Sequence, residues 1–176
     1  MISVPVSQCR LAGLMTLVMI LFTSPITSAA KTSLPSARDL LADARTVERT
    51  GIPLIVMVSL PGCPHCELVR RSHLLPLLRD TNATQKPLIR QVEINGQDML
   101  RDFSGRTITN AEFATRYKIK VVPGVIFLDA NGQMLTDSLV GAMIPDFYGA
   151  YFDAALAEAK ARLQNRNRPK LAKRAS

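Results

Sequence analysis

Residues 53–66 read PLIVMVSLPGCPHC, and this stretch decides the fold. Its first eight residues form an unbroken apolar run rich in β-branched side chains, which predicts a strand buried on both faces. Pro61 and Gly62 break the strand. A helical pattern begins at Cys63 and continues to about Asp80, and Pro76 within it predicts a kink. A buried strand therefore leads directly into a helix whose first turn carries two cysteines.

The sequence Cys63-Pro64-His65-Cys66 has a chemical reason at each position. A thiolate is the attacking species in disulfide exchange, and a helix N-terminus favours it over the thiol. Pro64 lacks an N–H group and fits the first helical turn, while a protonated His65 adds positive charge beside the sulfur. Cys66, three residues on, shares the helix face of Cys63. We predict that Cys63 is the nucleophile, that Cys66 resolves mixed disulfides, and that Pro64 and His65 tune the thiolate.

The flanking sequence predicts the remaining strands and helices. Ser36 and Asp39 form a capping-box pattern for a helix that ends at Gly51, and Thr109 and Glu112 form a second such pattern. The other predicted elements are strands over 87–94, 124–128 and 133–140, a loop over 95–105, a turn over 129–132, and a last helix from Pro145 to about Gln164. The order α-β-α-β-α-β-β-α predicts an α/β fold with a mixed central sheet and helices on both faces.

The first thirty residues have the layout of a secretory signal peptide. A short polar start is followed by the apolar run 11–22 and by small residues over 23–30. We expect cleavage after Ala29 or Ala30 and export to the periplasm. The alternative is an uncleaved membrane anchor, but the apolar run reaches only 16 residues even when extended to Ile26, and a membrane span needs about 20.

Removal of the signal peptide leaves two of the three cysteines, Cys63 and Cys66, because Cys9 departs with it. A disulfide scaffold joins distant segments, whereas a bridge across two intervening residues closes almost no loop and adds little entropic stability. The pair is therefore expected to be a redox-active disulfide rather than a structural one.

The formal net charge of the 176-residue chain is +8, but the excess belongs to its end. Residues 31–158 hold 14 basic and 14 acidic side chains, whereas seven basic residues lie at or beyond Lys160. This distribution argues against a nucleic-acid-binding face on the folded body. We predict a domain over residues 31–163 and a basic, disordered tail over 164–176. An unstructured solubilising end is favoured for this tail over weak contact with a membrane surface.

Over most of residues 36–163 the chain resembles the thioredoxin superfamily. The resemblance rests on the 53–60 strand, the Cys-Pro-His-Cys tetrapeptide, the helix interrupted at Pro76, the segment YKIKVVP over 117–123, and the strand GVIFL over 124–128 with its Asn-Gly turn. It implies a thioredoxin fold and thiol–disulfide oxidoreductase activity without a dissociable cofactor. It also implies that the peptide bond before Pro123 is cis and that Val122 and Pro123 bind the extended substrate chain beside the disulfide.

The sequence has features of two subtypes of this superfamily. Cys-Pro-His-Cys is typical of DsbA-type periplasmic oxidases, but residues 94–109 are too few for the helical insertion that those proteins carry. The length and the 122–129 region look more like small periplasmic reductants of the TlpA and SoxW kinds. The chain also departs from many thioredoxins at Met57, where they have a buried acid, so proton transfer is expected to use water, His65 or Glu67.

The sequence thus predicts an exported enzyme that exchanges disulfides with protein cysteines and is recycled by a membrane redox partner, with the direction of exchange open. Two other function classes remain. A redox-inactive binding or scaffold module would use the fold alone. A metal-binding module would use Cys63, Cys66 and His73, but a closed structural site needs a fourth ligand.

Overall fold

The computed structural model describes residues 33–80, 87–141 and 145–174. Its main sheet has four strands in the order β2-β1-β5-β6, namely Leu88–Glu93, Leu54–Ser59, Gly124–Leu128 and Leu139–Val140. Strand β1 pairs in parallel with β2 and antiparallel with β5, and β5 pairs antiparallel with β6. The mixed central sheet predicted from the sequence is therefore confirmed.

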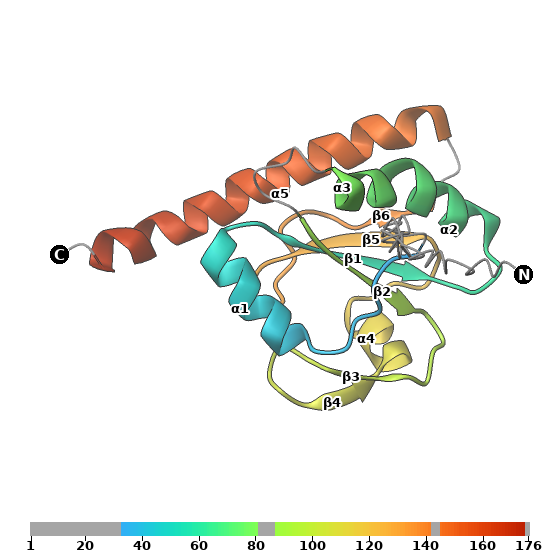
Figure 1. The fold of residues 1–176 in the computed structure, drawn as a ribbon, viewed down its shortest axis with the longest axis horizontal. Helices are drawn as coiled ribbons and strands as arrows, with labels where there is room; N and C mark the ends of the chain where they lie inside the picture. Colours follow the sequence, from blue (N-terminus) through green and yellow to red (C-terminus); the bar gives the residue numbers. More distant parts are fainter. Residues whose placement is uncertain (1–32, 81–86, 142–144, 175–176) are drawn as a thin grey trace, which may run out of the picture.

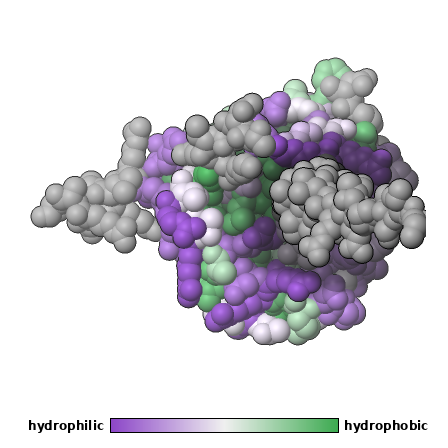
Figure 2. Space-filling model, in the orientation of Figure 1, coloured by the Kyte–Doolittle hydropathy of each residue, from purple (hydrophilic) through white to green (hydrophobic). Residues whose placement is uncertain are grey.

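Helices cover both faces of this sheet (Figure 1). Helices α2, α3 and α5 lie on one face, and α1 and α4 lie on the other. A π-helical turn, η1, joins α2 to α3. Hydrophilic residues dominate the visible surface in the same orientation, with smaller hydrophobic patches between them (Figure 2). The helical segments are α1 Leu40–Thr50, α2 Pro64–Val69, η1 Arg70–Leu74, α3 Leu75–Arg79, α4 Asn110–Arg116 and α5 Pro145–Arg174.

Strand β1 is the centre of the core. All six of its residues are buried, because sheet neighbours and helices enclose it on every side. Phe113, Phe127 and Phe152 from α4, β5 and α5 are among the largest fully buried side chains of the same cluster. The position of β1 is thereby fixed, and with it the point at which the chain leaves the sheet toward Cys63.

The start of α1 corrects the sequence prediction. Asp39 is the N-cap, and its side chain accepts a hydrogen bond from the N–H of Ala42 at 2.9 Å. Ser36, predicted as the cap, instead lies in a parallel bridge with Gln91 of β2, where the N–H of Ala37 donates to the Gln91 carbonyl at 2.8 Å. Main-chain pairing at the sheet edge outweighs the local capping pattern, and the helix begins later.

Two other predicted segments differ from the structure. The loop predicted over 95–105 contains β3, Met99–Arg101, which pairs with β4, Thr107–Thr109. Each strand has three residues with one buried side chain, which is too short a pattern to recognise. The strand predicted over 133–140 returns beside β5 through an isolated antiparallel bridge from Met134 to Leu128 and is regular only at β6. Between the two, the Leu135 carbonyl accepts a hydrogen bond from Arg162 of α5 at 2.8 Å.

The kink predicted at Pro76 is realised one turn earlier as the π-helical segment η1. Pro76 occupies the first turn of α3, and because it has no N–H it cannot form the usual helical hydrogen bond to the carbonyl of Ser72, four residues back. The N–H of Leu75 bonds instead to the carbonyl of Arg70, five residues back. The interrupted helix is confirmed, with the irregular turn placed between the cysteines and the proline.

Helix α5 continues to Arg174, whereas the sequence predicts an end near Gln164. Polar contacts rather than apolar periodicity hold this part of the helix to the body, since Arg166 pairs with Asp129 at 2.7 Å. Within the described ranges, no helix is both long and apolar enough to span a bilayer. The apolar run 11–22 lies outside them, so the signal peptide stays a prediction.

Buried Asp102 organises the turn between β3 and β4. Its carboxylate accepts hydrogen bonds from the Ser104 N–H and hydroxyl, from the Arg106 N–H, and from the Arg116 guanidinium at 2.8 Å. Burial alone would raise the pKa of Asp102, but the hydrogen bonds from Ser104, Arg116 and Arg106 outweigh it and hold that pKa well below its ordinary range. The turn therefore depends on an ionised carboxylate.

The Asp102→Asn substitution tests this dependence. A depressed carboxyl pKa stabilises the fold at pH values above that of the unfolded group, and the contribution disappears as the pH falls toward the folded-state pKa. We expect Asp102→Asn to lower the free energy of unfolding at neutral pH by about 1–3 kcal/mol. The stability of the variant should also fall less steeply than that of the wild type between about pH 5 and pH 2.

Urea unfolding over this pH range measures both effects. Asp98→Asn, at an exposed residue of the preceding loop, is the control and should behave as the wild type. Equal acid dependence in the wild type and in Asp102→Asn would contradict the assignment.

Candidate active site

A tight turn delivers Cys63 from the end of β1 to the start of α2. The N–H of Cys63 donates to the carbonyl of Leu60 at 3.3 Å, and Pro61 and Gly62 occupy the two central positions. Gly62 has φ of 72°, a conformation that strains residues with a side chain. The Pro-Gly pair read from the sequence as a strand breaker is thus the turn that positions the first cysteine.

Cys63 and Cys66 are joined by a disulfide, with their Cα atoms 5.2 Å apart. Cys63 is the N-cap of α2, and its sulfur accepts a hydrogen bond from the N–H of Cys66 at 3.1 Å. Pro64 is in the first turn of the helix, and both it and His65 are exposed. Cys63 is partly exposed whereas Cys66 is fully buried, so an outside sulfur can reach only one of the two.

The segment before β5 lies at the same end of the sheet as the disulfide. The peptide bond between Val122 and Pro123 is cis, as the family resemblance implied. Gly124, the next residue, pairs with Val58 of β1, whose chain continues to Cys63. Val122 is partly exposed and Pro123 is buried. The structure therefore places all six predicted site residues at the same end of the central sheet.

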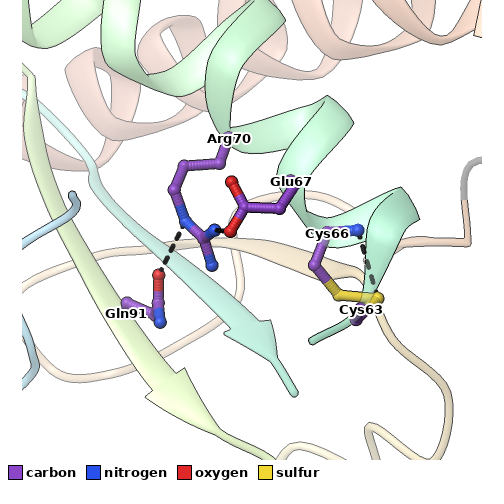
Figure 3. Close-up of a disulfide and its surroundings, with 5 residues drawn as sticks. All are labelled: Cys63, Cys66, Glu67, Arg70 and Gln91. Atoms are coloured by element: carbon purple, nitrogen blue, oxygen red, sulfur yellow. Dashed lines mark hydrogen bonds and ion pairs between the residues drawn. A yellow bond between two sulfur atoms is a disulfide. The ribbon is translucent and has the colours of Figure 1, made fainter. Parts of the chain in front are cut away.

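A charged network that sequence reasoning missed lies on the same helix as the cysteines (Figure 3). Arg70 forms an ion pair with Glu67 and donates from Nε to the Gln91 side-chain oxygen on β2 at 3.1 Å. Its side chain is only 10% exposed, whereas that of the neighbouring Arg71 is 77% exposed. The two arginines look alike in the sequence. The spacing could have distinguished them, because Arg70 is four residues after Cys66 and therefore lies on the same face of the helix, whereas Arg71 does not.

Glu67 is poorly suited to the proton-transfer role considered for it. The hydrogen bond from Arg70 holds the pKa of Glu67 below its ordinary range, and Arg71 pairs with the same carboxylate at 3.4 Å. Glu67 is thus an ionised partner of two arginines at neutral pH. Met57, singled out from the sequence, is fully buried.

His73, a residue of the metal-binding hypothesis, lies against α5. Its ring centroid is 5.2 Å from that of Tyr148 and 5.8 Å from that of Phe152. Burial against these rings holds the pKa of His73 below its ordinary range. In residues 33–80, 87–141 and 145–174, no group of three His, Cys, Asp or Glu side chains is placed to hold a metal ion.

Comparisons with known proteins give similar solved structures and one family model. Mitochondrial thioredoxin 3 from Saccharomyces cerevisiae is 14% identical, with a TM-score of 0.45 over 69% of this chain and 96% of its own. A DsbH oxidoreductase is 16% identical, with a TM-score of 0.47 over 72% of this chain and 87% of its own. A search of curated protein sequences finds no match. A family model described as a thioredoxin-like domain matches residues 40–157, and the chain belongs to this family.

Proposed function

We propose that this protein is an exported thiol–disulfide oxidoreductase that exchanges disulfides with protein cysteines through a mixed disulfide at Cys63. The observation that carries the proposal is the unequal exposure of the two bonded sulfurs at the start of α2. Cys63 is reachable from outside, while Cys66 is enclosed directly behind it. A purely structural bridge has no need for this arrangement, whereas exchange with a partner requires it.

The exchange needs no dissociable cofactor, because the two cysteine sulfurs themselves take up two electrons when the disulfide is reduced and give them up when it forms again. A partner thiolate attacks the Cys63 sulfur, a new bond forms between them, and Cys66 leaves as a thiolate. A second partner thiolate then attacks the partner sulfur of the mixed disulfide and releases Cys63. The partner loses two electrons and becomes a disulfide while this chain becomes a dithiol, and the reverse sequence reduces a partner. The Cys66 N–H bond to the Cys63 sulfur favours the thiolate of Cys63 in either direction.

The partner chain is proposed to bind along Val122 and Pro123 in an extended conformation. Two exposed apolar side chains flank this segment. Val121 is 57% exposed and Val140 is 50% exposed. Val140 lies on β6 opposite Gly124, the residue that follows Pro123. Their exposure supports an unfolded or extended apolar segment, rather than a strongly charged one, around the target cysteine.

For direction, which the sequence leaves open, we propose that the Cys63–Cys66 pair has an oxidising, DsbA-like potential, on a chain whose length is similar to that of the TlpA and SoxW kinds. The Cys66 N–H donates to the Cys63 sulfur and favours its thiolate, and stabilising the reduced form makes a disulfide more oxidising. Protein cysteines in the periplasm are the proposed substrates, with a membrane redox partner for recycling. Export follows from the signal-peptide pattern of residues 1–30, and an uncleaved anchor is the alternative.

Substitution of Cys66 by Ala should trap partners covalently on Cys63, because the resolving sulfur is gone. Extracts of cells producing Cys66→Ala, resolved without reductant, should show adducts that disappear on reduction. Cys63→Ala is the matched control and should trap none, since Cys66 is buried; both variants also carry Cys9→Ala, so that each has one cysteine. A redox-inactive binding module predicts reductant-insensitive capture that is the same in both variants. A metal module predicts stoichiometric metal on the purified wild type.

Differential alkylation tests which sulfur is the nucleophile. After mild reduction, iodoacetamide should modify Cys63 well before Cys66, because only Cys63 is partly exposed and hydrogen-bonded as an N-cap. Mass spectrometry of the peptides over time measures the order. Equal rates, or faster modification of Cys66, would contradict the proposed roles.

Equilibration with thioredoxin, whose potential is about −270 mV, tests the direction. Mixing equal amounts of oxidised protein and reduced thioredoxin should leave most of the electrons on this chain. An equilibrium that leaves most of them on thioredoxin would rule out the oxidising assignment.

A further inference from the structure

Arg70 is a charged residue in a buried place. Its guanidinium is held by the Gln91 side chain of β2 on one side and by the Glu67 carboxylate on the other (Figure 3). Arg71, the next residue, forms its contact with Glu67 while 77% of its side chain is exposed. Because water screens an exposed charge far more than a buried one, the charge of Arg70 acts more strongly on its surroundings than that of Arg71.

The reactive residue one helical turn before Arg70 is the buried cysteine, Cys66. The Arg70 N–H donates to the Cys66 carbonyl, so the two residues are one helical turn apart, and their side chains lie on the side of the helix that faces the sheet (Figure 3). Beneath them, Gln91 of β2 is in register with Met57 of β1. Arg70 therefore reaches the layer between helix and sheet beside Cys66, where the sheet offers a methionine and an amide rather than a carboxylate.

The described elements around this layer carry other charged or titratable groups. Strands β1 and β5 contribute none, because their sequences are LIVMVS and GVIFL. Strand β2 places Glu93 on the same face as Gln91, level with Ser59 at the end of β1. Among the described residues, the helix that bears the cysteines adds His65, Glu67, Arg71 and His73. Helix α5 adds Tyr148, whose ring packs against His73, and Asp153, whose charge acts on His73. Arg70 is the buried cation among them.

We propose that Arg70 is a positioning residue that stabilises the Cys66 thiolate, the form in which the buried sulfur attacks a mixed disulfide on Cys63. The inference rests on the proposed exchange function and concerns its resolving step. Burial in apolar surroundings disfavours a thiolate, and Cys66 is fully buried. A fixed positive charge one helical turn away offsets that cost without a proton-accepting side chain, and the Cys66 proton passes to solvent.

The step can be isolated with a chromogenic aromatic disulfide, dithiobis-nitrobenzoate. The reduced Cys63 thiolate attacks the probe, forms a mixed disulfide and releases a first coloured thiolate. The Cys66 thiolate then attacks the Cys63 sulfur, the bond from Cys63 to the probe breaks, and a second coloured thiolate leaves as the Cys63–Cys66 disulfide forms. The rate of the second release against pH reports the ionisation of Cys66. The full chain is used with Cys9→Ala so that only two cysteines react.

Four variants separate charge from structure. Arg70→Met removes the buried charge, and we expect the midpoint of the second release to rise by about one pH unit. The rate at neutral pH then falls only about threefold, because a thiolate of higher pKa is also more nucleophilic. Arg70→Lys keeps the charge and should restore most of the midpoint. Arg71→Met is the matched control and should shift it little. Glu67→Gln removes the opposing charge and should lower the midpoint.

The opposite directions expected for Arg70→Met and Glu67→Gln are the decisive feature, because loss of a structural contact would disturb the site in the same direction in both. Equal midpoints for Arg70→Met and Arg71→Met, or shifts of the same sign for Arg70→Met and Glu67→Gln, would overturn the inference. A Glu93→Gln shift larger than that of Arg70→Met would overturn it too, by making Glu93 the controlling group. A wild type that releases only one coloured thiolate would instead refute the proposed function.

Discussion

The enclosure of β1 on all sides is the constraint on which the rest of the structure depends. A strand without a polar side chain before its last residue is stable only where both faces and both edges are covered. β2 and β5 cover its edges and two helical layers cover its faces. Once β1 is fixed, the Pro61–Gly62 turn fixes Cys63, and the antiparallel register with β5 brings Val122 and Pro123 to the same end. The site is a consequence of where the most buried strand stops.

The reactive pair combines exposure with burial. Cys63 is exposed enough to meet partners at the surface, and Cys66 is buried between helix and sheet. Burial protects the resolving sulfur from other reactants but also opposes its ionisation. In the proposed role, the fixed positive charge of Arg70 offsets the cost of ionising buried Cys66, and no proton-accepting side chain is needed. The same charge would favour the reduced state and would therefore agree with the oxidising direction proposed for the pair.

Local sequence patterns predicted the parts of the molecule that local forces determine. The apolar run of β1, the Pro-Gly turn, the start of α2 and the capping box of α4 each have their reason within a few residues, and all are confirmed. The parts that were missed depend on polar contacts between distant segments. Ser36 pairs with β2, Arg162 and Arg166 hold α5 to the β5–β6 connection, and Gln91 receives the buried Arg70. No periodicity in the sequence predicts such contacts.

The most direct test of the account is a redox titration of Cys63 and Cys66 against mixtures of oxidised and reduced glutathione, with both cysteines quantified by alkylation and mass spectrometry. The account predicts one reversible two-electron transition in which the two thiols appear and disappear together. Cysteines that respond independently of each other, or a disulfide that does not reform after reduction, would contradict the central claim that this pair is a working redox centre.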